Sequence, residues 1–302
     1  MIVDSHNHLS EWSPDAVQTF DEMMQSATEI GLTGIVATDH YDIGSLTPYG
    51  KEWVLDPEAY RQEMYPRRVL PSERKPGDLP GFLYGIEIGY LPQHIDRLRA
   101  LIADYPWDIV IMSLHLINGY DPFHSPDEVY KSSLEETYRN ILTAIAESAA
   151  MLPEANIIGH YDYFSRYAPH DHPKMLYRHA PREFDRLFRI MIENEQALEI
   201  NTATIWKLQD ARGYSLEEAM PDSEVLQRYL ELGGNLISIS SDAHSASNVG
   251  RLVPETCAWL QEHGVNDHVW FENGKLFRAP FEQSPGVNIS EVNKDANLSG
   301  YN

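Results

Sequence analysis

Histidines and acidic residues recur along this chain in short motifs that could bind metal ions and support hydrolysis. Neutral imidazole and carboxylate groups together suit zinc, manganese or iron, and sites that mix them are typical of hydrolytic metal clusters. Two of the motifs place such residues at alternate positions, so that both side chains project to the same side of an extended chain. In chain order the motifs are His6-Asn7-His8, Thr38-Asp39-His40, Glu87, His115, His160 and Ser241-Asp242-Ala243-His244.

Each motif follows a short apolar segment that we expect to be a β-strand. Longer amphipathic segments separate these strands, which is typical of βαβ units in a mostly parallel sheet. In a (β/α) barrel the carboxyl ends of the strands build the active site, and six of the seven expected strands end at a motif. Strands are expected at 1–4, 34–38, 82–86, 109–113, 157–159, 197–200 and 236–240, and helices at 16–30, 92–103, 126–150, 181–193 and 223–232.

Two long connections interrupt this alternation. Residues 41–81 are rich in Pro and Gly and form an insert after the second strand, which could be a lid over the site. Residues 161–179 are rich in His, Tyr and Pro. We expect one domain over residues 1–280, followed by a polar tail over 281–302.

The composition limits the classes of partner. The chain has 23 basic and 46 acidic residues, a net charge of -23, which disfavours nucleic acid and anionic lipid as partners. No basic segment followed by an apolar stretch opens the sequence, and no run of about 18 apolar residues occurs, so we expect a cytoplasmic protein without a membrane span. Cys257 is the single cysteine, so histidine and carboxylate groups must supply any metal ligands. The oligomeric state is not predicted.

The order of the motifs resembles the PHP (polymerase and histidinol phosphatase) superfamily over residues 1–250. Three further stretches are similar to its histidinol-phosphate phosphatase branch. They are Ser113-Leu114-His115 followed by Asn118-Gly119, Gly159-His160-Tyr161-Asp162, and Glu199-Ile200-Asn201-Thr202.

This resemblance implies a distorted (β/α)7 barrel, similar to a TIM barrel, that binds two to three divalent ions of Zn, Mn or Fe. In the loop after His8, Asp15 stands where some histidinol phosphatases have a histidine, and it is the expected substitute. The implied ligands are His6, His8, Glu87 and Asp242 for the first ion, Glu87, His115 and His160 for the second, and Asp15, His40 and His244 for the third.

The resemblance also implies hydrolysis of a phosphate monoester, with L-histidinol phosphate, an intermediate of histidine biosynthesis, as the expected substrate. Two cations about 4 Å apart lower the pKa of a bridging water, and the resulting hydroxide can attack phosphorus. The leaving oxygen could receive a proton from Asp15, from His244 or from a water on the third ion. The residues expected to act in catalysis are Asp15, Glu87, Asp242 and His244.

Basic side chains are needed to bind the phosphate, because guanidinium and ammonium groups pair with its oxygens. Arg166, in the loop after the fifth strand, is the first candidate. Lys207 follows an Asn-Thr motif after which histidinol phosphatases often carry a basic residue, and Arg251 is a weaker alternative.

Other interpretations of these residues do not involve function. His40 and His160 could be buried core histidines, Glu87 and Asp242 could cap helices, and Arg166 could be only a surface charge or an ion-pair partner. Aromatic residues near the motifs could line a pocket, although packing is the commoner role. They are Trp12, Tyr41, Tyr90, Tyr161, Tyr163 and Trp206. The remaining histidines are expected at the surface, at positions 94, 124, 170, 172, 179, 263 and 268.

Two other functions fit the same motifs. One is a phosphoesterase of the same superfamily that acts on another small phosphate or on a nucleotide. The other is a non-catalytic module in which metal ions only stabilise the fold.

Overall fold

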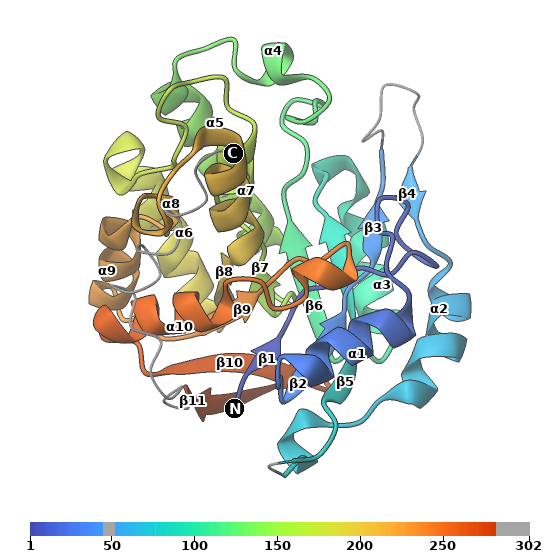
Figure 1. The fold of residues 1–302 in the computed structure, drawn as a ribbon. Helices are drawn as coiled ribbons and strands as arrows, with labels where there is room; N and C mark the ends of the chain where they lie inside the picture. Colours follow the sequence, from blue (N-terminus) through green and yellow to red (C-terminus); the bar gives the residue numbers. More distant parts are fainter. Residues whose placement is uncertain (45–51, 76, 282–302) are drawn as a thin grey trace, which may run out of the picture.

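Seven parallel strands form the central sheet of the computed structural model, which describes residues 1–44, 52–75 and 77–281 (Figure 1). The strands follow one another in the order β1-β2-β5-β6-β7-β8-β9, and each is hydrogen-bonded to the next. Their bounds are β1 Val3–Asp4, β2 Gly34–Ala37, β5 Gly81–Gly89, β6 Ile109–Ser113, β7 Ile157–Ile158, β8 Ala197–Asn201 and β9 Ile237–Ser240.

The sheet curls into a nearly closed barrel. Its two ends meet where Ser5 N donates to the carbonyl of Ile239 at 3.2 Å and where Asn7 forms a parallel bridge with Ala243. Residues of these strands are buried on both faces, as expected of a parallel sheet covered by helices. The prediction of a seven-stranded α/β barrel is therefore confirmed, with one change: the third strand runs past Glu87 to Gly89.

Helices after the strands cover the outside of the barrel. Helix α1 begins at a capping box in which Thr19 and Glu22 satisfy each other's backbone N–H groups. The longer ones are α1 Phe20–Glu29, α3 Ile95–Asp104, α5 Leu134–Met151, α6 Pro181–Glu193, α7 Thr202–Arg212, α9 Ser223–Glu231 and α10 Val253–Glu262. Shorter helices are α4 Pro126–Val129, α8 Leu216–Ala219, and the 3-10 turns η3 Pro92–His94, η4 Tyr163–Arg166, η5 Tyr177–His179 and η6 Ala246–Asn248.

One predicted helix is divided. Residues 126–150 were expected to form one helix, but α4 ends at Val129 and α5 begins only after Ser133. The Ser133 hydroxyl accepts from the backbone N–H of Glu136, and this cap favours a new helix start.

The described parts of the insert after β2 pack on the barrel. Strand β3 His40–Asp42 pairs in parallel with β5, so that His40 lies opposite Glu87, and β4 Trp53–Val54 pairs with β3. Helix α2 Pro57–Met64 buries Tyr60 in the core, and η1 Tyr65–Arg67 and η2 Pro71–Glu73 complete the segment. The proposed lid includes residues 45–51 and 76, which lie outside the described residues.

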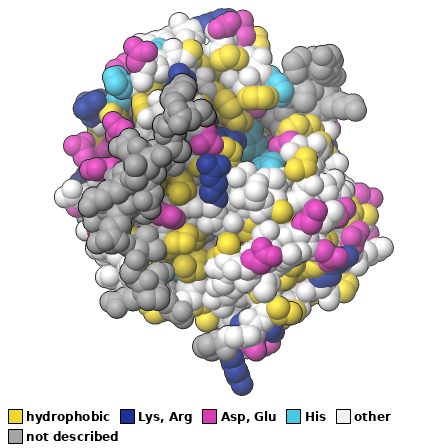
Figure 2. Space-filling view, viewed as in Figure 1, with side chains coloured by type: hydrophobic (Ala, Val, Ile, Leu, Met, Phe, Trp, Pro, Cys, Tyr) yellow, Lys and Arg dark blue, Asp and Glu magenta, His cyan; other side chains and the backbone are white. Residues whose placement is uncertain are grey.

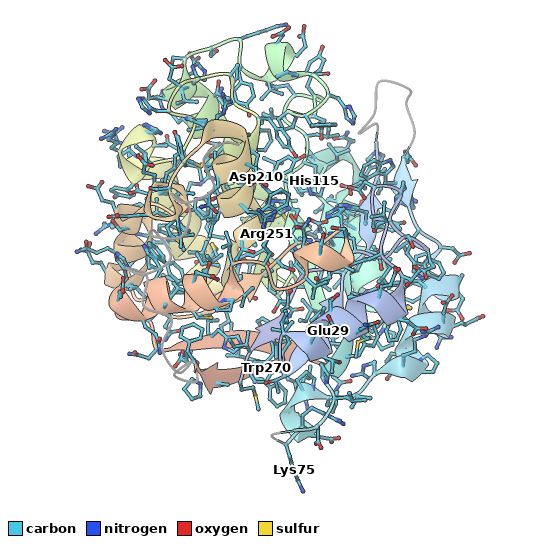
Figure 3. The ribbon with its side chains drawn as sticks, viewed as in Figure 1. Glu29, Lys75, His115, Asp210, Arg251 and Trp270 are labelled. Atoms are coloured by element: carbon cyan, nitrogen blue, oxygen red, sulfur yellow. The ribbon has the colours of Figure 1, made fainter. Side chains whose placement is uncertain are left out.

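A hairpin that the sequence did not predict closes the amino-terminal end of the barrel. Strands β10 Asp267–Glu272 and β11 Lys275–Pro280 are antiparallel and lie below the central strands in Figure 1. Trp270 packs there with Val3 and Ile109, at the opposite end of the barrel from His115 (Figure 3). The predicted tail, apart from Phe281, lies outside the described residues. In the described ranges, none of the helices is both long and apolar enough to cross a membrane.

Candidate metal centre

The nine residues predicted as metal ligands come together at the carboxyl end of the barrel. Seven of them, together with Asp42, form groups in which the potential ligand atoms lie within 4.8 Å of one another. Parallel strands bring this about, because consecutive strand ends meet at one edge of the sheet. The groups are His6, His8 and Glu87; Glu87, His115 and His160; His8, His40 and His244; and His40, Asp42 and His115.

Glu87 lies at the centre of the cluster. Its Oε1 is 3.1 Å from Nε2 of His115 and 3.0 Å from Nε2 of His160. Its Oε2 is 3.3 Å from Nε2 of His6 and 3.6 Å from Nε2 of His8. One carboxylate thus faces two pairs of histidines, an arrangement in which it could bridge two ions.

Asp242 approaches the same histidines from the last strand. Its Oδ1 lies 3.4 Å from Nε2 of His8 and 3.8 Å from Nε2 of His6. The backbone of Asp242 has a φ of 50°, a left-handed conformation that is unusual for a residue other than glycine. Such strained positions occur often at functional sites. Neither Asp242 nor Glu87 caps a helix, so that interpretation is excluded.

Asp15 joins the cluster at its more open side. Its carboxylate lies 3.6 Å from Nε2 of His40 and 3.0 Å from Nε2 of His244. The side chains of Asp15 and His244 are 35% and 27% exposed, whereas that of His40 is 7% exposed. These three residues could hold a further ion that is accessible from solvent.

The outer nitrogens of several rings are held by hydrogen bonds. Nδ1 of His6 donates to Glu199 at 2.8 Å, and Nδ1 of His115 donates to Asp42 at 2.8 Å. Nδ1 of His8 donates to the hydroxyl of Ser13, and this hydroxyl in turn donates to Asp39. With the proton on Nδ1, the lone pair of Nε2 points into the cluster, as in many histidine-ligated metal sites.

Several atoms that face the cluster are buried without a hydrogen-bond partner among the described residues. They include Nε2 of His6, Nε2 of His8, both ring nitrogens of His40 and Oε2 of Glu87. Leaving such groups unpaired costs roughly 1–3 kcal/mol each. A divalent cation satisfies nitrogen and carboxylate donors together, so this set fits bound metal. It does not fit the interpretation of His40 as a satisfied core histidine.

Electrostatics in the cluster favour positive charge. Burial lowers the pKa of His6, but the carboxylates of Glu87, Glu199 and Asp242 outweigh it and raise that pKa well above its usual range. Burial, together with the positive charges of His244 and His40, lowers the pKa of His8 to about 3. The carboxylates therefore favour positive charge in the cluster. The histidines lie too close together for all of them to be protonated.

Comparison with known proteins agrees with this geometry. The family model of the PHP domain matches residues 4–203. The chain belongs to the PHP domain family.

Relatives of this PHP domain include two named histidinol phosphatases. A probable histidinol-phosphatase of Clostridium acetobutylicum is 28% identical over 251 residues, covering 83% of this chain and 89% of the relative. The histidinol-phosphatase of Lactococcus lactis is 25% identical over 274 residues, covering 91% and 96%.

Solved structures share the fold. The crystal structure of histidinol phosphate phosphatase from Lactococcus lactis with zinc, L-histidinol and phosphate has a TM-score of 0.76 at 24% identity, covering 91% of this chain and 98% of that one. A putative histidinol phosphatase from Listeria monocytogenes has a TM-score of 0.67 at 17% identity, covering 84% and 100%.

A cavity of about 480 Å³ in this PHP domain is lined by seven of the predicted metal ligands. Figure 2 shows histidine side chains in a hollow beside hydrophobic ones. Arg166 and Lys207 both line the cavity, as predicted for residues that bind substrate. Arg166 is buried and donates to Thr204, Asn201 and Asp242. The interpretation of it as a surface charge is therefore wrong, but it does form an ion pair, in which its Nη1 lies 3.2 Å from Oδ2 of Asp242.

The weaker alternative, Arg251, does not line the cavity. It pairs with Asp210 and stacks on Trp206, and Figure 3 shows Arg251 and Asp210 close together beside the site. Among the aromatic candidates, Trp206 and Tyr163 line the cavity, whereas Tyr41, Tyr90 and Tyr161 are buried in the core.

Among the histidines expected at the surface, His124 meets the expectation and His268 does not. His124 is exposed but lines the cavity, and His268 is fully buried, where its Nε2 accepts from the backbone N–H of Val3. His268 begins a continuous run of buried residues in β10, so recognising this buried strand would have predicted its burial.

Sequence reasoning missed three buried acids of the site. Asp42 alternates with His40, just as Asp242 does with His244, and this spacing was the available signal. Glu199 lies on the sixth barrel strand, the one strand that ends without a predicted ligand. Asp121 lines the cavity from a loop and had no sequence signal.

Proposed function

We propose that this protein is a metal-dependent phosphatase that hydrolyses L-histidinol phosphate to L-histidinol and phosphate. The observation that carries the proposal is the convergence of unpaired histidine and carboxylate atoms at the floor of a cavity whose wall carries Arg166 and Lys207. The names of the relatives in Clostridium acetobutylicum and Lactococcus lactis support the choice of substrate.

The predicted ligand sets agree with the distances in the structure. Glu87 is the proposed bridge between the first and second ions. Bound divalent cations would lower the pKa of water and neutralise phosphate oxygens. The zinc in the Lactococcus lactis structure supports Zn, and Mn or Fe are also compatible with these ligands. The proposed ligands are His6, His8, Glu87 and Asp242 for the first ion, Glu87, His115 and His160 for the second, and Asp15, His40 and His244 for the third.

Arg166 and Lys207 orient the phosphate in this proposal. Three of the five N–H groups of Arg166 are used by Thr204, Asn201 and Asp242, which fix the plane of the guanidinium group. The remaining N–H groups are available to phosphate oxygens. Lys207 adds a second, more adaptable positive charge on the same cavity wall.

The leaving oxygen needs a proton. With the third ion bound, a water held by that ion would supply this proton, and without it the proposed source is Asp15 or His244. Both line the cavity, and Oδ2 of Asp15 lies 3.0 Å from Nε2 of His244. Because both side chains are partly exposed, they can exchange protons with solvent between turnovers.

The outer half of the cavity matches the organic part of L-histidinol, which has an imidazole ring and a primary ammonium group. Its aromatic lining includes Tyr163, Tyr167 and Phe123, which offer faces for a planar ring. Asp121 is buried beside them, where it accepts from two backbone N–H groups and from Tyr163. Its carboxylate is placed to pair with the ammonium group.

The test is a comparison of kcat/KM for phosphate release from L-histidinol phosphate, glycerol phosphate and nucleoside monophosphates, using protein purified without chelator. We expect kcat/KM for L-histidinol phosphate to exceed the others by at least about 100-fold, the contribution of one charge-assisted hydrogen bond and ring contacts. A higher kcat/KM for a nucleotide or for glycerol phosphate would refute this substrate. Such a result would indicate a phosphatase that acts on a different substrate.

A further inference from the structure

Two buried carboxylates lie just outside the proposed ligand set and contact its histidines. Asp42 is 2% exposed and Glu199 is 1% exposed, and they approach the cluster from different strands, β3 and β8. Burying a carboxylate costs free energy unless it is fully hydrogen-bonded. The contacts of each carboxylate therefore indicate its role.

Glu199 holds residues from two strand ends. Its Oε1 accepts from Nδ1 of His6 at 2.8 Å and from the Ser240 hydroxyl at 2.6 Å. Its Oε2 accepts from the backbone N–H of His160 at 2.5 Å and from the Asn201 amide at 3.3 Å. Four donors thus fix this carboxylate, and through it the ring of His6 and the backbone of His160.

Asp42 contacts two other histidines, His115 through a hydrogen bond and His40 at an ion-pair distance. Its Oδ1 accepts from Nδ1 of His115 at 2.8 Å, and its Oδ2 lies 3.0 Å from Nδ1 of His40. The same nitrogen of His40 also lies 3.0 Å from Oε2 of Glu87. The position of Asp42 depends on Gly89, which is paired with Asp42 across strands β3 and β5. A Cβ atom at residue 89 would lie 1.7 Å from Oδ1 of Asp42, so a side chain there would displace the carboxylate.

Each carboxylate contacts ligands of two neighbouring proposed sites. Glu199 connects His6 of the first site with His160 of the second, and Asp42 connects His115 of the second with His40 of the third. An ion that orders one ligand therefore also orders the carboxylate and, through it, a ligand of the next site.

We propose that Asp42 and Glu199 are positioning residues that couple the binding of neighbouring metal ions. Glu199 couples the first and second sites, and Asp42 couples the second and third. This inference rests on the ligand sets of the proposed function, but it does not depend on the substrate.

The test compares Glu199→Gln and Asp42→Asn with the wild type. Metal-free protein is equilibrated with Zn²⁺ at a series of buffered free concentrations. The number of bound ions is measured by plasma mass spectrometry, and the occupancy of each site by anomalous diffraction from crystals in the same buffers. Loss of a carboxylate that orients a ligand lowers metal affinity by roughly 10- to 100-fold. We expect that loss at the first and second sites in Glu199→Gln, and at the second and third in Asp42→Asn.

Two further variants separate positioning from general loss of stability. Gly89→Ala displaces Asp42 without altering it and should reproduce the pattern of Asp42→Asn. Glu272→Gln removes another buried carboxylate, which accepts from Ser72 and Trp270 at the opposite end of the barrel, and should keep wild-type zinc affinity. The free energy of unfolding of each metal-free variant is measured by urea denaturation. It should fall in Glu272→Gln without any loss of zinc affinity.

Wild-type affinity at all sites in both Glu199→Gln and Asp42→Asn would overturn the positioning role. Weakening of one site only, or of all three equally, would overturn the coupling. A wild-type protein that binds no zinc would instead contradict the proposed metal centre itself, so the two failures are distinguishable.

Discussion

Oε1 of Glu87 lies 3.1 Å from Nε2 of His115, across the neighbouring strands β5 and β6. The other oxygen of the same carboxylate faces His6 and His8. Glu87 is therefore shared between two groups of histidines. We expect metal binding by each group to require the histidines of that group, and metal binding by both groups to require Glu87.

Replacing His115 with Ala should remove one proposed ion and lower kcat by at least about 100-fold, while the fold stays intact. His115 follows the end of β6 and lines the cavity, so its loss opens no gap in the hydrophobic core. The measurements are kcat, bound metal by plasma mass spectrometry and the thermal unfolding midpoint. His263→Ala, at an exposed histidine after α10, is the matched control. Wild-type kcat in His115→Ala would remove this residue from the site.

Replacing Asp121 with Asn should raise KM for L-histidinol phosphate by about 10- to 100-fold, because a charge-assisted hydrogen bond contributes about 1.5–3 kcal/mol. KM for an analogue without the amino group, 3-(imidazol-4-yl)propyl phosphate, should stay unchanged. Steady-state kinetics on both substrates test this, with Asp127→Asn, an exposed acid of α4, as the control. An equal rise in KM for both substrates would show that Asp121 does not recognise the ammonium group.

Lys207 should make substrate binding depend on pH. Burial and the nearby charge of Arg166 lower the pKa of Lys207 to about 8. The charged form binds phosphate, so KM should rise as pH increases above 8, by up to about tenfold per unit until the contribution of Lys207 is lost. In Lys207→Arg the rise should disappear, because guanidinium stays charged. A rise that persists unchanged in this variant would assign the titration to another group.

The barrel, and the gathering of His and acidic residues at one end of it, could be predicted because both follow from local patterns. Short apolar strands end at His and acidic residues, and parallel pairing alone brings those ends together. Glu199 was missed because its contacts with His6 and His160 are hydrogen bonds that no spacing in the sequence reveals. Asp42 was missed although it alternates with His40, because it does not end an expected strand. The β10–β11 hairpin was missed although its strands flank an Asn273-Gly274 turn, in which both residues have positive φ, as in a two-residue hairpin. Only the barrel end that it covers is far away in sequence.

His268 should make the protein less stable in acid. Burial and the positive N-terminal amino group lower its pKa to about 4 from 6.5. The neutral ring therefore supports the fold fully above pH 6.5, and this stability is lost as pH falls from 6.5 toward 4, by up to about 3 kcal/mol. Urea denaturation across this range should show a smaller change in the free energy of unfolding for His268→Gln. An identical pH dependence in that variant would assign the acid sensitivity to other groups.

The most direct test of the central claim is a titration of metal-free protein with Zn²⁺ or Mn²⁺ while phosphate release from L-histidinol phosphate is recorded. The account predicts no activity without metal, a rise as ions bind to the Glu87 cluster, and a plateau at two to three ions per chain. Full activity in the metal-free protein, or none after two to three ions have bound, would contradict it.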